Sequence, residues 1–392
     1  MRNETKYYID HSLYTILLLF ITGGVSQTFF AHMGLSPSQI SLISSFLNIA
    51  QIAIMIFNIF VSDMIKNLKK TISILRLTPI LYFGPFLYFC FAEAPSTNVF
   101  FYCAVIVSCA FNLFLGFYNV LSYRFIYHII DIKNYAKLSN TGLIISSTLT
   151  ILASAVISYC SSVFDFKYVI ITGFSISIVF SVIASLINNS MVIKNHNDTT
   201  QTNKFEFSRL LKREFTYFYF PNLMRGCANG IMSVISVICI KNISDSPAVL
   251  STLVTVYYVA SIIGSIIYET VRKKIKTGTI YALSSILMLL FLPFSLIGNN
   301  TTVFFIFYTL AAIFYLIIAN SCAIYFSEII HYNDIGSYTA IRLITMTLGQ
   351  AISSFLVALL IDRIPSVYIL ILCGVCQLIS GLMFYFYKPK QK

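Results

Sequence analysis

Apolar runs of about twenty residues recur along the whole chain, and they constrain the fold more than any other feature of the sequence. Only 10% of the residues are charged, whereas about 25% are charged in soluble domains. Runs of this length and composition cross a bilayer as α-helices. We count twelve, centred near residues 23, 50, 82, 111, 150, 178, 228, 258, 288, 313, 350 and 376. The sequence therefore predicts an all-α polytopic membrane protein with twelve transmembrane helices.

The Lys and Arg residues are distributed unevenly between the predicted loops. If the N-terminus is cytoplasmic, the cytoplasmic loops and tails contain 21 of the 26, including Arg76, and the outside loops contain three. This bias predicts a plasma (inner) membrane protein with both termini in the cytoplasm. The net charge of +12 is then a topology signal and a contact for membrane lipid, and nucleic acid is not expected as a partner.

A polar segment from Asn188 to Arg213 divides the chain into two halves. We expect an N-terminal six-helix bundle at 1–189, a cytoplasmic linker at 190–214 and a C-terminal six-helix bundle at 215–392. The halves share residues at a constant separation of 200 positions, such as Ile129 and Ile329, or Tyr168 and Tyr368. Since each half has six spans, the two copies should have the same orientation in the membrane.

Two loops carry an acid at the end of a helix followed by several bases. They are Asp63–Lys70 after the second span and Glu269–Lys276 after the eighth. This pattern resembles the signature of the major facilitator superfamily, in which a glycine and an acid precede a basic loop. The resemblance covers the whole chain through its twelve spans, central loop and internal repeat, although Ile59 stands where the glycine is usual.

The resemblance implies a fold of two six-helix bundles and a role in secondary transport. It also implies that Asp63 is a gating residue, with Arg124 or Arg342 as its partner and Glu269 as the equivalent acid in the second half. The alternative is an ordinary positive-inside loop with an incidental acid.

Arg225 lies near the middle of the seventh span, for which we expect one helix over residues 217–240. A guanidinium at this depth costs about 2.5–3.5 kcal/mol on insertion scales. No acid is expected at the same depth, and Arg is the preferred bidentate partner of carboxylate and phosphate groups. We therefore predict that Arg225 anchors an anionic substrate. The alternative is a structural Arg that bonds to backbone carbonyls.

Other polar residues inside the spans recur at helical spacing and predict further substrate contacts. Spans one, four, seven and ten line the central cavity in the resembled superfamily. The candidates on these spans are Gln27, Asn112, Asn119, Asn222, Asn229, Tyr315 and Asn320. Helix packing is the alternative for the small residues that accompany them.

The sequence contains no motif of an enzyme, and we expect neither a cofactor nor a metal site. Because we expect every acid in a loop or near the end of a span, a carboxylate-driven proton symporter is disfavoured. We predict a monomeric secondary active or facilitative transporter that moves a small polar solute, with an anionic one favoured, by alternating access. A lipid-linked saccharide flippase or a multidrug efflux carrier is the alternative.

Overall fold

Every regular element that the structure describes is a helix. The computed structural model describes residues 3–21, 24–61, 65, 67–91, 96–129, 132–193, 213–329 and 335–386. Eleven of its helices are long and apolar enough to cross a membrane, and there are twelve such spans if the bent pair Phe218–Ser233 and Ile235–Asn242 is one span. The prediction of an all-α polytopic membrane protein is confirmed.

The chain forms two compact units. The first consists of residues 1–201 with 245–255, and the second of residues 202–244 with 256–392. The predicted boundaries at 189 and 215 stay a prediction, because residues 194–212 lie outside the described ranges.

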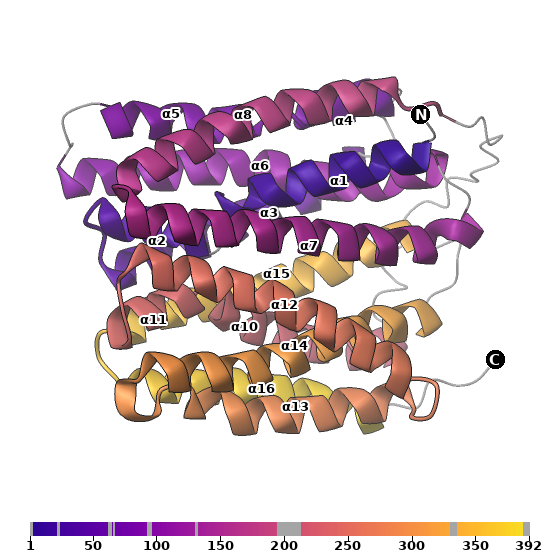
Figure 1. The fold of residues 1–392 in the computed structure, drawn as a ribbon. Helices are drawn as coiled ribbons and strands as arrows, with labels where there is room; N and C mark the ends of the chain where they lie inside the picture. The colour runs from indigo at the N-terminus through magenta and orange to yellow at the C-terminus, as the bar shows by residue number, and fades with distance from the viewer. Residues whose placement is uncertain are drawn as a thin grey trace. The chain divides into compact units, whose positions relative to one another are not determined.

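In the first unit, α1 packs against α7 and α8, while α3 packs against α6 (Figure 1). Helices α4 and α5 pack against both α6 and α8. The helices are α1 (Asn3–Leu19), α2 (Gly24–His32), α3 (Pro37–Val61), α4 (Leu68–Leu75), α5 (Pro79–Phe91), α6 (Thr97–Ile129), α7 (Ile132–Val163) and α8 (Phe166–Ser190).

The third span is interrupted between α4 and α5, where Pro79 has no N–H to continue the helix. Two serines of α8 bind carbonyls at this break: Ser181 Oγ donates to the Arg76 carbonyl at 2.8 Å, and Ser185 Oγ donates to the Ser73 carbonyl at 2.7 Å. A broken helix is tolerated in a membrane only when its free backbone groups find such partners. Arg76 therefore belongs to a span, and its expected place in a loop is wrong.

In the second unit, α10 packs against α15 and α16, and α13 packs against α14 and α16. The elements are α10 (Arg213–Ser233), α11 (Ile235–Asn242), α12 (Pro247–Val271), α13 (Thr277–Phe294), the 3-10 turn η2 (Ile297–Asn299), α14 (Thr301–Ile329), α15 (Ile335–Leu360) and α16 (Ser366–Phe386).

The first span of each unit consists of two consecutive helices, α1 with α2 and α10 with α11. Residues 3–32 and 213–242 have the same length, and the breaks follow α1 at Leu19 and α10 at Ser233. The expectation of one continuous helix over 217–240 is wrong, because α10 and α11 meet at Val234 with a bend of 42°.

Glycines allow α10 and α15 to approach closely. A Cβ on Gly226 would lie 2.9 Å from the carbonyl carbon of Met346, and a Cβ on Gly349 would lie 2.7 Å from the amide nitrogen of Cys227. Both neighbours are backbone atoms, which cannot rotate away. This crossing fixes the position of the helix that carries Arg225.

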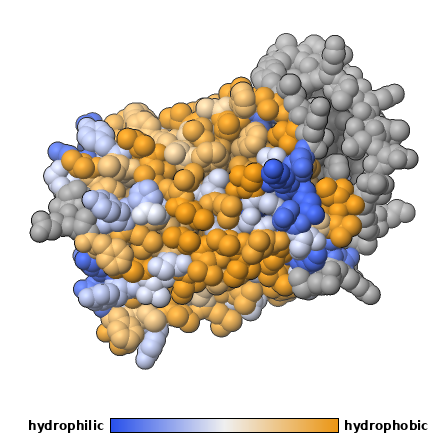
Figure 2. Space-filling model, turned by 90° about the horizontal axis from the view of Figure 1, so that it is seen from above, coloured by the Kyte–Doolittle hydropathy of each residue, from blue (hydrophilic) through white to orange (hydrophobic). Residues whose placement is uncertain are grey.

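Hydrophobic side chains cover most of the face shown in Figure 2, and hydrophilic ones gather toward its two ends. Large apolar side chains such as Phe91 and Ile106 are 71% and 67% exposed. A surface of this kind is stable in contact with lipid, as expected for a multi-pass membrane protein.

Candidate functional site

Arg225 is buried inside the second unit, with 6% of its surface exposed. Among the described residues, no group accepts a hydrogen bond from its buried Nε and Nη1 atoms. No ion pair between Arg225 and a described carboxylate is present either. The guanidinium therefore has donor capacity that the described part of the chain does not use.

Side chains from three other helices surround Arg225. Its charge interacts with Cys322 and Tyr315 of α14 and with Tyr281 of α13. It also interacts with Tyr257 of α12. We call these five residues, with Asn229, the Arg225 cluster. Tyr315 and Asn229 are joined by a hydrogen bond of 2.9 Å from the Tyr hydroxyl to the Asn Oδ1.

Tyr281 extends the polar region to α16. Gln377 Nε2 donates to the Tyr281 hydroxyl at 3.1 Å, so that hydroxyl is free to donate to Ser380 Oγ, which lies 2.8 Å away. The sequence interpretation missed Tyr281 and Gln377, because each lies in an apolar span with no polar stripe. The signal it could have used is Gln377 itself, a rare amide in the middle of the last span.

Two predicted substrate contacts in the second unit are used in bonds between helices. Asn222 Nδ2 donates to the Arg342 carbonyl at 2.7 Å and to Thr345 Oγ1 at 2.8 Å. Asn320 Nδ2 donates to Ser265 Oγ at 3.2 Å. The structure thus brings Asn229 and Tyr315 to Arg225, while Asn222 ties α10 to α15 and Asn320 ties α14 to α12.

The three candidates in the first unit lie on α2 and α6. Asn112 is buried and donates to the Ser108 carbonyl of its own helix at 3.0 Å. Asn119 is half-buried, and its carbonyl accepts a bond from Ser122 Oγ at 3.0 Å. Gln27 is buried in α2, directly after the break in the first span.

The predicted gating residues are described only in part. Asp63 and the side chain of Arg124 lie outside the described residues. Glu269 forms an ion pair of 2.6 Å with Arg272 of the same helix end, in which both side chains are more than 40% exposed. Arg342 is half-buried in α15. The gating role of these residues therefore stays a prediction.

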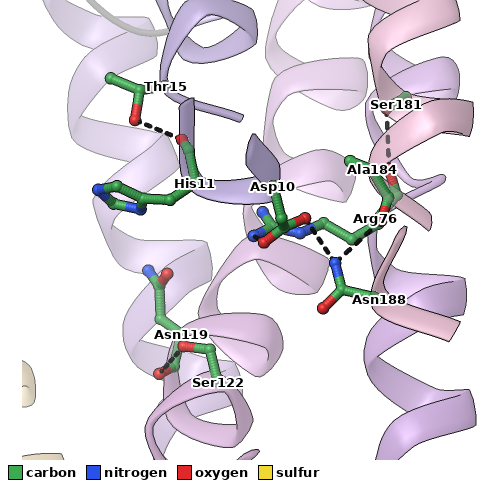
Figure 3. A network of polar contacts seen from close by, with 9 residues as sticks. All are labelled: Asp10, His11, Thr15, Arg76, Asn119, Ser122, Ser181, Ala184 and Asn188. Carbon is green, nitrogen blue, oxygen red and sulfur yellow. Dashed lines mark hydrogen bonds and ion pairs between the residues drawn. The ribbon is translucent and has the colours of Figure 1, made fainter. Parts of the chain in front are cut away.

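An acid that the sequence interpretation overlooked lies inside the first span. Asp10 is 4% exposed on α1 and forms an ion pair with Arg76, while Asn188 of α8 donates to its other carboxylate oxygen (Figure 3). The sequence interpretation did not expect a buried acid in this span. Asp10 was missed because its partner lies 66 positions away and only the fold brings them together.

Two aromatic rings enclose the guanidinium of Arg76. Its central carbon lies 3.8 Å from the ring centroid of Tyr14 and 4.3 Å from that of Tyr118. Both distances are within the range of a cation–π interaction. Asp10, Tyr14, Arg76, Tyr118 and Asn188 are called the Asp10 cluster below. No group of three or more His, Cys, Asp or Glu within the described residues could hold a metal ion.

Comparisons with known proteins agree on one fold. Residues 218–392 match the family model of the Major Facilitator Superfamily, and no curated protein matches the chain by sequence. The solved structure of the nucleoside transporter NupG has 14% identity and a TM-score of 0.68, and covers 99% of this chain and 100% of its own.

Two sugar transporters are equally similar in fold. The xylose transporter XylE from E. coli, in an inward open conformation, has 12% identity and a TM-score of 0.73 over 99% of this chain and 96% of its own. The E. coli fucose:proton symporter FucP has 14% identity and a TM-score of 0.65 over 100% of this chain and 98% of its own. Identities this low establish the fold and leave the substrate open.

Proposed function

We propose that this chain is a membrane transporter of the major facilitator superfamily and that it moves a small polar, anionic solute by alternating access. The structural neighbours support the size and polarity of the solute, since their names state a nucleoside, xylose and fucose as cargo. The anionic character rests on this chain alone.

The observation that carries the proposal is the unused hydrogen-bonding capacity of Arg225. Leaving a buried donor unpaired costs about 1–3 kcal/mol, and more when the group is charged. A carboxylate or phosphate on the solute would accept bonds from Nε and Nη1 together, in the fork geometry that an Arg provides. The solute would thus offset a cost that the empty site bears.

The neighbouring hydroxyl and amide groups would orient the bound solute through hydrogen bonds. Tyr315 and Asn229 already bond to each other, so a solute hydroxyl can join them as a third partner. Asn112, Asn119, Gln27, Asn222 and Asn320 remain candidates for contacts made elsewhere in the transport cycle.

We also propose a membrane location, a topology and a set of gating residues. We place the protein in the plasma (inner) membrane as a monomer, with both termini in the cytoplasm and lipid on its apolar surface. Asp63, with Arg124 or Arg342, and Glu269 would control the opening of the cytoplasmic side.

The test is uptake into proteoliposomes from a panel of organic anions, phosphorylated solutes and neutral sugars. Removing one partner of a buried charge pair costs at least about 2 kcal/mol, so we expect Arg225→Gln to lower kcat/KM for the transported anion about 30-fold or more. Arg225→Lys should recover only part of this loss, because it lacks the fork.

Arg363→Gln serves as the matched control, since Arg363 is exposed in the turn before α16 and should leave uptake unchanged. The proposal fails if the transported solute is neutral and Arg225→Gln carries it as well as the wild type does.

A further inference from the structure

We propose that Asp10 is a proton-binding site, and that its protonation controls the break between α4 and α5. The site lies in the first unit, so it is separate from the Arg225 cluster and goes beyond the proposed anion site. It would link the conformation of the first unit to the proton concentration.

Asp10 is the one buried carboxylate among the described side chains. Its Oδ2 atom pairs with Arg76 Nη2, and its Oδ1 atom accepts a bond from Asn188 Nδ2. Three helix segments therefore meet at one carboxylate: α1 through Asp10, the end of α4 through Arg76, and α8 through Asn188. Figure 3 shows the three side chains converging on this point.

The charged and titratable groups around Asp10 are few. Among the described side chains, Arg76 supplies the one positive charge in contact with Asp10, and the hydroxyls of Tyr14 and Tyr118 are near enough to interact with the carboxylate. His11 follows on α1, where its ring stacks on Tyr7 at 5.6 Å between centroids.

The other two packed helices add nothing ionisable near Asp10 within their described side chains. Those of α7 include only Tyr159 and Cys160, which lie at the end of that helix. Those of α8 include only Lys167 and Tyr168, more than five turns from Asn188 at about 3.6 residues per turn. Within the described side chains, Asp10 and the neighbouring His11 are therefore the groups of this region that can take up a proton.

Protonation of Asp10 would leave the cluster with an uncompensated positive charge. The ionised pair is neutral as a whole, whereas an Asp10 carboxylic acid would leave Arg76 as an uncompensated charge inside the membrane. The guanidinium would then have to move toward water. Arg76 is the cap residue directly after α4, and its carbonyl is held by Ser181, so its movement would shift the break itself.

The contacts from α8 show how such a shift would spread. Ser181, Ser185 and Asn188 follow one another at helical spacing on one face of α8. The two serines hold the carbonyls of the break, and Asn188 holds Asp10. A change at Asp10 therefore acts on the same strip of α8 that stabilises the broken span.

Infrared difference spectroscopy of the full-length protein between alkaline and acidic pH tests the proton site without knowledge of the solute. We expect a carbonyl band of a water-shielded carboxylic acid in the wild type and in Glu4→Gln, whose carboxylate is exposed. The band should be absent in Asp10→Asn.

The double variant Asp10→Asn/Arg76→Met removes both charges, so it leaves no lone guanidinium and keeps the protein folded if the single variant does not fold. It must lack the band as well. A wild type without this band at every pH at which it is folded, or a band that persists in either variant, overturns the proposal.

Hydrogen exchange measures the effect on the break. After correction for intrinsic rates, peptides from residues 68–91 should exchange at least about tenfold faster at acidic pH, while residues 277–294 of the second unit serve as the internal control. Asp10→Asn should exchange fast at both pH values. Equal pH dependence of the two segments would show that Asp10 does not control the break. Neither experiment involves Arg225, so a negative result in either one would not count against the proposed anion site.

Discussion

The crossing of α10 and α15 predicts a large effect from adding a single methyl group. A Cβ on Gly226 would lie 2.9 Å from the carbonyl carbon and 3.0 Å from the Cα of Met346. Carbon atoms in good contact are about 3.5–4.0 Å apart, so the helices would have to separate by about 0.6 Å or more. Overpacking of this kind costs about 1–3 kcal/mol, and the upper end applies because the obstacle is backbone.

Alanine gains about 1 kcal/mol in helix propensity over glycine, so we expect Gly226→Ala to lower stability by about 2 kcal/mol. For a unit of 150–250 residues this corresponds to a fall of about 4–8 °C in Tm. Thermal unfolding in detergent, followed by circular dichroism, measures it.

Gly84→Ala is the matched control, because a Cβ at Gly84 would meet nothing within 4 Å. This variant should unfold at the wild-type temperature or slightly above it. If Gly226→Ala and Gly84→Ala shift Tm equally, the close approach of α10 and α15 is refuted.

Two further substitutions separate buried from exposed interactions by the same thermal assay. Tyr315→Phe removes the donor to Asn229 Oδ1 and should cost about 1–3 kcal/mol, because Asn229 is 7% exposed and its acceptor would be left unpaired; an unchanged Tm would show that this bond contributes nothing. Glu269→Gln breaks the ion pair with Arg272, in which both side chains are more than 40% exposed, and should cost less than about 1 kcal/mol. A larger loss would mean that Glu269 has another partner.

The architecture could be predicted from composition because a bilayer admits few backbone solutions. Each span must satisfy its own peptide groups, so twenty apolar residues imply a helix whatever their order. The breaks in the spans were harder to predict. In the first span, α2 begins at Gly24, a residue type whose backbone is unusually free. Nothing comparable marks Val234, where α10 ends without a glycine or proline at the bend.

The hydropathy pattern was enough to select Arg225 and Asn229 as candidate site residues. Arg225 stood out because a charge interrupts an apolar run, and the repeat of polar residues along its helix led to Asn229. Asp10 and Arg76 did not stand out, because each lies near the end of its apolar run and resembles a loop residue. Their burial is a property of the pair, and pairing between spans cannot be obtained from the periodicity of a single helix.

The Asp10–Arg76 pair has a consequence for how the protein enters the membrane. Each charge alone makes its span costly to insert, by about 2.5–3.5 kcal/mol at the helix centre and less toward its end. The two charges offset each other only after the ribosome has made the 66 residues that separate them, which takes about 3–13 s at the usual rate of synthesis. The first span is therefore least secure in the bilayer during this interval, and the N-terminal unit is completed as a group of helices rather than one helix at a time.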